Sequence, residues 1–367
     1  MKRMLCIVGG MNAGGAETFL MKIYRALDRS QYQMDFAVAV KDKGFYDDEI
    51  MSMGGKIFHI VPKSDGFFKN FFDIRRIVKE NGYKSVLRTS QHSLSALELL
   101  AARLGGAKKL IFRSSNSNTA TGNKRDLLLH RICRFMPVLF ANVRIAPSKE
   151  AAEFMFGENC LKNGHAQIVY NGINLDYYKF DQDARERIRD EFGLKDCFVL
   201  GHVGRFNRQK NHVFLIKLFY EFQKKRDDAK LLLVGKGELE SEIKQQCESL
   251  GISNKVVFAG VRSDMPALYS AMDVFVFPSL YEGMPNAVIE AQACGLKCLV
   301  SNRVTRDANV TDCVVFLPID ADDVYVWFEK IVECRSQKEK KFFIPKDYDI
   351  KTVATNFINL FFETENA

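Results

Sequence analysis

The chain has 367 residues, of which 47% are hydrophobic, and it carries a formal net charge of +8. This length and composition predict a globular protein with two separate cores and exclude a disordered chain. The excess positive charge lies in the first half and is densest between residues 108 and 144, where Asp126 is the one acidic residue among Lys108, Lys109, Arg113, Lys124, Arg125, Arg131, Arg134 and Arg144. That region suits an anionic partner, but no nucleic-acid recognition motif accompanies it, so nucleic acid is not expected.

The nine cysteines are an odd number without metal-ligand spacing, which indicates reduced thiols in a cytosolic protein. The first ten residues have the positive charge of a signal peptide, but their apolar run is too short and no cleavage site follows it. No apolar stretch approaches the roughly 18 residues that span a bilayer. We therefore expect a cytoplasmic protein, either free or peripheral on the inner face of the cell membrane.

The first half predicts strands alternating with helices, which favours a parallel sheet. A buried strand over 5–10 leads through the glycine loop G-G-M-N-A-G-G-A-E into a helix over 18–27. Gly14 and Gly15 let a ligand approach the loop backbone closely, but the spacing is not the G-x-G-x-x-G dinucleotide fingerprint. Further strands are expected at 34–40, 56–60, 85–88, 109–112, 143–146 and 167–170. Further helices are expected at 47–53, 67–81, 94–104 and 149–154, the last with Ser148 as its N-cap.

The segment 123–140 is apolar but is interrupted by Arg125, Arg131 and Arg134. A basic amphipathic helix of this kind can lie on an anionic membrane surface. An ordinary helix with one face in the core and one in solvent is the alternative. Farther along, the turn residues at 171–174 and the polar run 181–190 mark a domain boundary.

The second half repeats the strand and helix alternation. Strands are expected at 198–203, 230–234, 256–258 and 274–277, and helices at 214–225, 239–250, 265–271 and from Asn286 to Gly295. Two α/β domains in tandem, 1–172 and 173–349, leave a cleft between the carboxyl ends of their sheets, where open α/β sheets bind ligands.

The stretch after the strand 274–277 is the strongest candidate site. A turn containing Glu282 delivers the chain to a helix N-terminus at Asn286, whose free amides suit an anionic or hydroxyl-rich ligand. Glu290 lies about two helical turns further on, where its carboxylate can accept hydrogen bonds from a diol. Helix capping and surface charge are the alternative roles of these two carboxylates.

A second candidate loop follows the strand 198–203. Arg205 and Lys210 stand there at the carboxyl end of a strand, and a guanidinium with an ammonium can neutralise a diphosphate. A solvated basic loop is the alternative.

Several motifs together resemble one family, the retaining glycosyltransferases of the GT-B fold numbered family four. They are G-G-A-E-T-F near the start, A-P-S-K-E-A and Y-N-G-I-N at the domain junction, G-H-V-G-R-F-N-R-Q-K-N, L-L-L-V-G-K-G-E-L-E, and F-P-S-L-Y-E-G-M-P-N-A-V-I-E-A-Q-A-C-G. The wording S-L-Y-E-G and E-A-Q-A-x-G-L is similar to that of bacterial enzymes of exopolysaccharide and capsular polysaccharide synthesis. The resemblance covers almost the whole chain and implies an α/β fold with two Rossmann-like parallel-sheet domains facing across a cleft.

The resemblance also implies roles for individual residues. Glu290 would accept hydrogen bonds from the ribose, Glu282 would contact the donor sugar, and Arg205 with Lys210 would hold the diphosphate. The helix-tip backbone would be presented by Gly283, Met284, Pro285 and Asn286. Gly14 and Gly15 would close from the other domain, and Val261 would contact the base through its backbone. The last helix, about 350–367, would return to the first domain.

The implied reaction is transfer of a sugar from a nucleotide-sugar donor, with uridine diphosphate the expected carrier, to a hydroxyl of a glycan or lipid-linked glycan, with retention. The fixed positive charge makes a metal or other cofactor unnecessary. The Asp-x-Asp tripeptides at 320–322 and 347–349 lie far from the predicted loops, so no metal site is expected.

The chain departs from its relatives at one point. They often carry histidines after the strand that ends at Phe112, where this chain has Arg113, Ser114, Ser115 and Asn116. His92, after the preceding strand, is the substitute candidate for the catalytic contact, and a hydrogen-bonded loop histidine is the alternative. A non-catalytic scaffold of the same fold is the main competing function. A nucleotide-sugar epimerase lacks recognisable acid and base residues, and an NAD-dependent dehydrogenase lacks its fingerprint.

Overall fold

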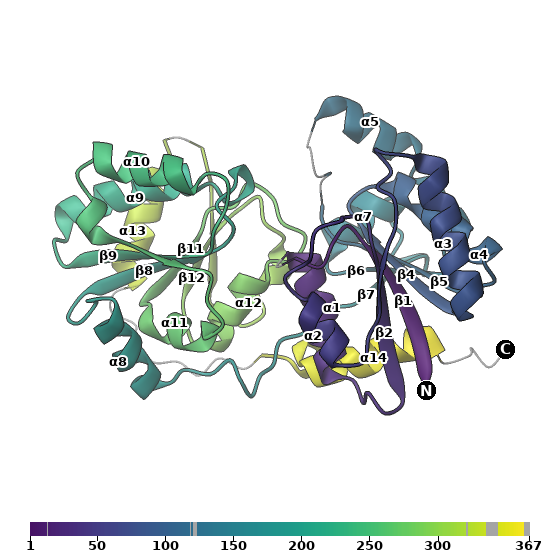
Figure 1. Ribbon diagram of the computed structural model, residues 1–367. Helices are drawn as coiled ribbons and strands as arrows, with labels where there is room; N and C mark the ends of the chain where they lie inside the picture. The colour runs from purple at the N-terminus through teal and green to yellow at the C-terminus, as the bar shows by residue number, and fades with distance from the viewer. Residues whose placement is uncertain (13, 118, 120–122, 321, 335–343, 363–367) are drawn as a thin grey trace. The chain divides into compact units, whose positions relative to one another are not determined.

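The computed structural model describes residues 1–12, 14–117, 119, 123–320, 322–334 and 344–362. They form two compact units: Met1–Gly172 with Lys346–Ala367, and Ile173–Pro345 (Figure 1). The second unit ends at Pro345, a few residues before the boundary of 349 expected from the sequence. The reason is that Tyr348 stacks on Tyr170 of the first unit, with ring centroids 4.3 Å apart.

The first unit contains a seven-stranded parallel sheet in the order β3-β2-β1-β4-β5-β6-β7. Its strands are β1 Lys2–Val8, β2 Tyr32–Val38, β3 Ile57–His59, β4 Ser85–Ser90, β5 Lys109–Ser114, β6 Val143–Ala146 and β7 Gln167–Ile168. Its helices are α1 Gly15–Ala26, α2 Asp47–Ser52, α3 Phe67–Asn81, α4 Leu97–Leu104, α5 Lys124–Ile132, α6 Phe135–Phe140, α7 Lys149–Phe156 and α14 Ile350–Phe362, with short 3₁₀ turns η1 Ser93–Ala96 and η5 Lys346–Tyr348. The order of strands reverses between β1 and β4, so the loops after these two strands flank the position where doubly wound sheets bind ligands.

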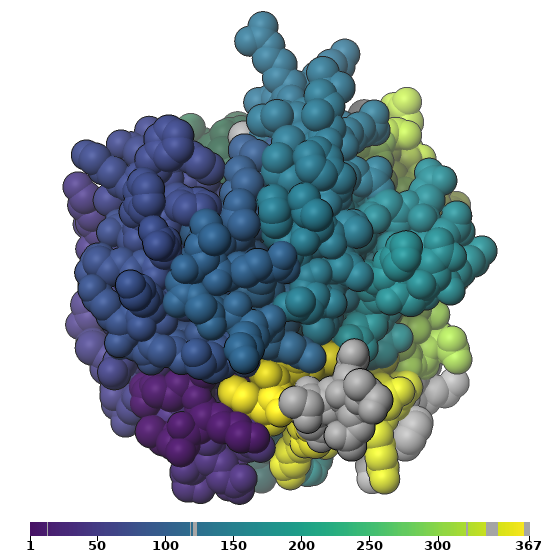
Figure 2. Space-filling model, turned by 90° about the vertical axis from the view of Figure 1, so that its right-hand side faces the viewer, coloured from purple at the N-terminus to yellow at the C-terminus, as the bar shows by residue number. Residues whose placement is uncertain are grey.

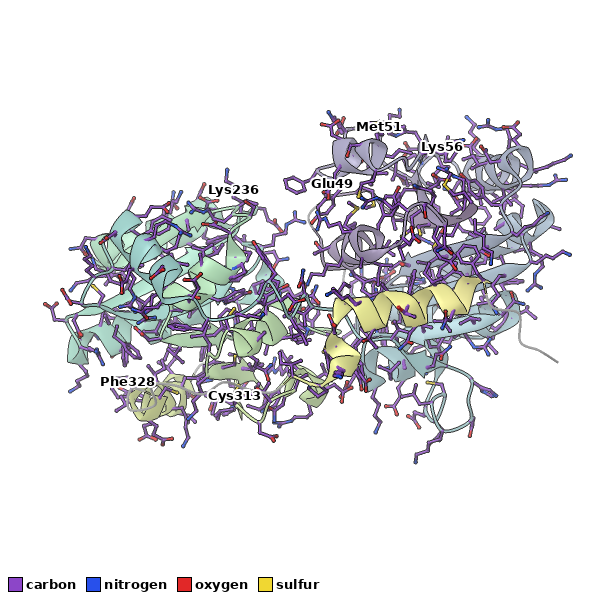
Figure 3. All side chains as sticks on the ribbon, turned by 90° about the horizontal axis from the view of Figure 1, so that it is seen from below. Glu49, Met51, Lys56, Lys236, Cys313 and Phe328 are labelled. Carbon is purple, nitrogen blue, oxygen red and sulfur yellow. The ribbon has the colours of Figure 1, made fainter. Side chains whose placement is uncertain are left out.

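The C-terminal helix α14 packs on the first unit, where it contributes to the same core as α1 and β1 (Figure 3). The Phe357 ring lies edge-on to Phe19 of α1, with centroids 5.7 Å apart. Ser85 at the start of β4 donates a hydrogen bond to the carbonyl of Phe361 at 3.0 Å. Residues far apart in the sequence therefore share one hydrophobic core.

The second unit repeats this topology with six parallel strands in the order β10-β9-β8-β11-β12-β13. The strands are β8 Phe198–Val203, β9 Ala229–Val234, β10 Val256–Gly260, β11 Val274–Phe277, β12 Cys298–Ser301 and β13 Val314–Leu317. The helices are α8 Gln182–Glu191, α9 His212–Lys225, α10 Glu240–Ser249, α11 Met265–Ala271, α12 Asn286–Ala293 and α13 Val324–Cys334, with 3₁₀ turns η2 Arg208–Lys210, η3 Ser253–Lys255 and η4 Arg306–Ala308. Here the order reverses between β8 and β11, which places the loops after these strands next to each other.

The structure confirms most of the predicted elements and corrects three points. The run 181–190 is helix α8 of the second unit, not a boundary segment, because Arg185 and Arg189 reach Asp273 at 2.6 and 2.7 Å and pin the helix to the unit. The segment 123–140 forms two helices, α5 and α6, because the backbone leaves the helical conformation at Cys133. The elements β12, β13 and α13 were not predicted. None of the described helices is long and apolar enough to cross a membrane.

Candidate active site

The loop after β8 is shaped to present one ammonium group. Asn207 accepts a hydrogen bond from the Lys210 amide at 3.1 Å, and Asn211 takes a left-handed conformation with φ of 55° before α9 begins. The Lys210 stem then crosses Gly204, where a methyl group would lie only 3.0 Å from Lys210 Cδ. The ammonium lies 4.5 Å from the centroid of the Phe277 ring. A methyl group at 204 would thus require the Lys210 stem to shift by a few tenths of an ångström.

Lys210 meets Glu282, although 72 residues separate them in the chain. Their Nζ and Oε1 atoms are 2.6 Å apart, and the side chains are only 16% and 11% exposed. Two hydrogen bonds of Gln209 hold the loops together: its side-chain amide Nε2 donates to the Tyr281 carbonyl, and its backbone carbonyl accepts from the Leu280 amide, both at 2.8 Å. The sequence prediction did not pair these two residues, and the parallel order of β8 and β11 brings them together.

The start of α12 lies directly after this pair. Pro285 occupies the N-cap position, and no side-chain cap bonds this end of the helix. The amide oxygen Oδ1 of Asn286 and the hydroxyl of Ser279 are buried and have no hydrogen-bond partner among the described residues. Buried polar atoms usually have partners, so these two atoms and the uncapped amides mark a place suited to a polar ligand. Gly283, Met284 and Pro285 are buried in the turn that leads to it.

Glu290 lies on the second turn of α12 and is 8% exposed. Its Oε2 atom accepts a hydrogen bond from the Tyr269 hydroxyl at 3.1 Å. Burial raises the pKa of both Tyr269 and Tyr178, and the nearby Glu290 carboxylate with its hydrogen bonds raises them further. The two tyrosine hydroxyls therefore orient the Glu290 carboxylate. Tyr178 and Tyr269 were not among the predicted site residues; the Tyr-Tyr pair that follows the turn at Asn174 was the available signal for Tyr178.

Arg205 and Val261 lie on neighbouring loops of the same unit. Arg205 is well exposed and pairs with Glu238, after β9, at 3.1 Å. The loops after β8 and β9 touch through their backbones, because a methyl group at Gly235 would lie 2.1 Å from the Gly204 carbonyl oxygen. Val261 follows β10 and is 55% exposed. Arg205 is thus not held beside Lys210 by a direct contact in the structure.

Two buried histidines behind Lys210 were also missed. His202 on β8 contacts the Val276 carbonyl through Nδ1 at 2.8 Å, and the His212 ring stacks on Phe206 with centroids 4.2 Å apart. Burial, together with the charge of Lys210, lowers the pKa of His212 to about 4. Burial also lowers the pKa of His202 well below its usual value. Both rings are therefore neutral near pH 7, and they pack beside the loop without adding charge.

The glycine loop belongs to the first unit. Gly14 is the N-cap of α1 and has no capping side chain, and a methyl group there would lie 2.4 Å from the Glu17 carboxylate. Gly15 is the first residue of the helix. The helix thus begins three residues earlier than predicted.

Arg113 stands where the family resemblance led us to expect histidine, and it is almost fully buried. It donates a hydrogen bond to Asn171 Oδ1 at 2.7 Å, and its guanidinium carbon lies 3.9 Å from the centroid of the Phe19 ring. Burial lowers its pKa to about 9. These contacts indicate that Arg113 ties β5 to α1 and to the end of the first unit.

His92 has partners at both ring nitrogens. Its Nδ1 accepts from the Leu94 amide at 3.1 Å, so the proton belongs on Nε2, which lies 3.3 Å from the Asp126 carbonyl of α5. A neutral imidazole bonded in this way keeps no lone pair for a substrate proton. The geometry therefore favours the structural alternative for His92.

Comparisons with known proteins agree with this architecture. The family model described as "Glycosyl transferases group 1" matches residues 184–312, and the one described as "Glycosyltransferase Family 4" matches residues 13–177. The chain is 33% identical over 343 residues to the putative glycosyltransferase EpsF of Bacillus subtilis, covering 93% of this chain and 89% of that protein. It is 28% identical over 255 residues to an Escherichia coli protein named UDP-Gal:alpha-D-GlcNAc-diphosphoundecaprenol alpha-1,3-galactosyltransferase, covering 67% and 64% of the two chains.

Solved structures share the fold. The Anabaena protein Alr3699/HepE, crystallised in complex with UDP-glucose, has a TM-score of 0.73 at 19% identity and covers 99% of this chain and 96% of its own. The predicted GT-B fold with two Rossmann-like domains is thus confirmed. From its matching family regions and its similarity to EpsF along nearly its whole length, the chain belongs to glycosyltransferase family 4.

Proposed function

We propose that this glycosyltransferase moves a sugar, with retention, from a UDP-sugar to a hydroxyl of a lipid-linked glycan in the synthesis of a bacterial surface polysaccharide. The observation that carries the proposal is the contact between Lys210 and Glu282 beside the uncapped start of α12. An ammonium, a carboxylate and the uncapped end of α12 lie close together there, and we assign the ammonium to the diphosphate and the carboxylate to the sugar.

The choice of donor rests on two similarities. The Escherichia coli relative is named for UDP-Gal, and the Anabaena protein of the same fold was crystallised with UDP-glucose. In this chain, Glu290 would accept hydrogen bonds from the ribose hydroxyls, and Tyr178 and Tyr269 would keep its carboxylate in place. Val261 would contact the base through its backbone, and Arg205 would turn from Glu238 toward the diphosphate.

The choice of acceptor rests on the names of relatives. The Escherichia coli protein and a Campylobacter jejuni protein, 28% identical over 171 residues, are both named for sugars linked to a diphosphoundecaprenol lipid. An acceptor with such a lipid lies in a membrane, so we propose that the chain works peripherally at a membrane face.

In the proposed reaction the bond between sugar C1 and the diphosphate oxygen breaks, and its electron pair leaves with the diphosphate. The acceptor oxygen bonds to C1 on the same face, and its proton passes to the departing phosphate oxygen. Lys210 and the α12 amides stabilise the charge that develops on the diphosphate, without reorganisation and without a metal ion. Glu282 holds the donor sugar, and no covalent intermediate on the protein is needed.

The test uses purified protein, a panel of radiolabelled UDP- and GDP-sugars, and membrane lipid extract as acceptor, with and without EDTA. Label transferred to lipid from a UDP-sugar supports the proposal, and nuclear magnetic resonance of the product determines the anomeric configuration. If UDP-sugars raise the melting temperature but no label moves to any acceptor, the non-catalytic scaffold is the better description. Loss of transfer in EDTA would contradict metal independence.

A further inference from the structure

Helices α5 and α6 expose an unusual number of apolar side chains. Six large apolar residues within twelve positions are between 41% and 62% exposed: Leu128, Leu129, Ile132, Phe135, Val138 and Leu139. Single exposed apolar residues are common on protein surfaces, but a contiguous group marks a contact site. We call these six residues the α5–α6 surface.

The exposed apolar residues recur at helical spacing on each of the two helices. Leu128 and Ile132 are one turn apart on α5, and Phe135 and Leu139 are one turn apart on α6. The α6 side chains also line an open groove of about 560 Å³, which is closed by Arg134, Phe156 and Gly157. The surface is therefore both apolar and hollowed, which suits a flexible hydrocarbon chain better than water.

Basic side chains surround this apolar face. Lys124, Arg125 and Arg131 are exposed, and Arg134 lies at the groove, where it donates to the Glu153 carbonyl at 2.6 Å. The one acidic residue of α5, Asp126, lies with its carboxylate 3.5 Å from His92 Nε2. Apolar residues flanked by positive charge complement a surface that is apolar inside and negative at its edge.

The inner side of α5 is firmly attached to the unit. His130 accepts a hydrogen bond from the Ser93 amide at 3.1 Å, and its other ring nitrogen lies 3.0 Å from the Phe154 carbonyl of α7. The His92 ring, which caps the start of η1, lies 3.3 Å from the Asp126 carbonyl through its Nε2 atom. The exposed face thus belongs to a well-anchored helix, and in Figures 1 and 2 this part of the chain lies at the outer edge of the first unit.

We infer that the α5–α6 surface docks on an anionic lipid bilayer. Ile132, Phe135 and Leu139 enter the boundary between head groups and acyl chains, and Arg125 and Arg131 bind lipid phosphates. Only the biological purpose of this docking, access to a lipid-linked acceptor, rests on the proposed function.

The experiment is vesicle flotation of the full chain, without nucleotide sugar. One set of vesicles contains phosphatidylglycerol and phosphatidylcholine, and the other contains phosphatidylcholine alone. We expect binding to the anionic vesicles that weakens as salt is added, because salt screens exposed charges. The double variant Ile132→Gln/Leu139→Gln should bind on the order of a hundredfold less, from the loss of two inserted apolar side chains. Arg125→Gln/Arg131→Gln should bind about 25-fold less, at roughly fivefold per basic residue.

Matched controls come from α13 of the second unit. Tyr325 and Val332 are 70% and 49% exposed, so Tyr325→Gln/Val332→Gln should bind vesicles as the wild type does. The inference would be overturned if the Ile132→Gln/Leu139→Gln variant bound anionic vesicles as tightly as the wild type does. It would also be overturned if the wild type bound both kinds of vesicle equally. A third outcome is that the wild type binds no vesicles but is a dimer by light scattering, and that the Ile132→Gln/Leu139→Gln variant is a monomer. That result would assign the surface to contact with a second copy of the chain instead.

Transfer to a water-soluble acceptor analogue separates this inference from the proposed function. The vesicle-binding variants should retain that activity, since their substitutions lie outside the residues assigned to donor binding. A wild type that transfers sugar but never binds vesicles refutes only the docking surface.

Discussion

The contact between Lys210 and Glu282 leads to an unusual expectation: removing the charge of Glu282 should strengthen binding of UDP while removing transfer. The two groups are 2.6 Å apart and largely shielded from solvent, so the carboxylate competes with a diphosphate for the same ammonium. A hydrogen bond to a charged group contributes about 1.5–3 kcal/mol. Glu282→Gln should therefore bind UDP about tenfold more tightly, from the lower end of that range.

Substitution of Lys210 should have the opposite effect on UDP binding. Lys210→Met removes the cation itself and should weaken UDP binding about 10- to 150-fold, from the same range of energies. Transfer should fall further, about 10²- to 10³-fold in kcat, because the lost charge acts most strongly on the developing diphosphate anion. Glu282→Gln should lose transfer to a similar degree because the donor sugar is no longer held.

Isothermal titration calorimetry with UDP and initial rates with a radiolabelled UDP-sugar measure these effects. Lys217→Met, an exposed lysine on α9 of the same unit, is the matched control and should leave both unchanged. If Glu282→Gln weakens UDP binding as much as Lys210→Met, the carboxylate does not compete for the ammonium. The roles assigned to this pair would then be wrong.

Gly235→Ala should lower the stability of the second unit by at least about 2 kcal/mol, because φ is 135° and the new methyl group meets the Gly204 carbonyl oxygen at 2.1 Å. His212→Phe should reduce the loss of folding stability that occurs as the pH falls. The folded pKa of His212, about 4, lies below the unfolded value of 6.5, so the unfolded chain binds more protons and stability falls by about 3 kcal/mol as pH falls from 7 to 4. Phe357→Ala should lower the stability of the first unit by about 3–5 kcal/mol, because the ring is fully buried against Phe19. Urea unfolding measures all three.

Each of these predictions has a specific contrary result. Gly193 has a φ of 64° but no atom within 4 Å of an added methyl group, so Gly193→Ala should cost less than Gly235→Ala; equal costs would exclude the steric argument. An unchanged pH dependence in His212→Phe would show that His212 is not buried and neutral. Phe67→Ala, at a 37% exposed ring, should have little effect, and a Phe357→Ala protein as stable as Phe67→Ala would contradict the packing of α14 on the first unit.

Local sequence patterns were sufficient to predict most of the helices and strands. The uninterrupted apolar run Val274–Phe277 suits a strand covered on both faces, and the predicted bounds of this strand and of Phe198–Val203 agree with the structure. Ser148 caps α7 as predicted, by accepting a hydrogen bond from the Ala151 amide. These features depend on neighbouring residues, so the sequence is enough to recognise them. The run 181–190 was misread because its polar composition hides the contacts of Arg185 and Arg189 with Asp273.

Only part of the candidate site could be predicted from local sequence patterns. The motifs identified Lys210, Glu282 and Glu290 as separate residues, and the resemblance to a family supplied their expected roles. Neither showed that Lys210 and Glu282 form one pair, or that Tyr269 and Tyr178 surround Glu290. From the sequence, His92 could be either a catalytic contact or a hydrogen-bonded loop histidine, and the Asp126 carbonyl 3.3 Å from its Nε2 atom favours the second role.

By itself, the sequence determined two α/β units, the glycine and basic loops, and a helix that begins beside a glutamate. The tertiary structure decided which of these meet, because parallel strands that are distant in the chain lie side by side and bring the loops at their carboxyl ends together. The tertiary structure also determined which titratable groups are charged and which apolar side chains are exposed. Burial makes His212 neutral and encloses Arg113, whereas the apolar residues of α5 and α6 remain at the surface, and none of these outcomes depends on sequence neighbours alone.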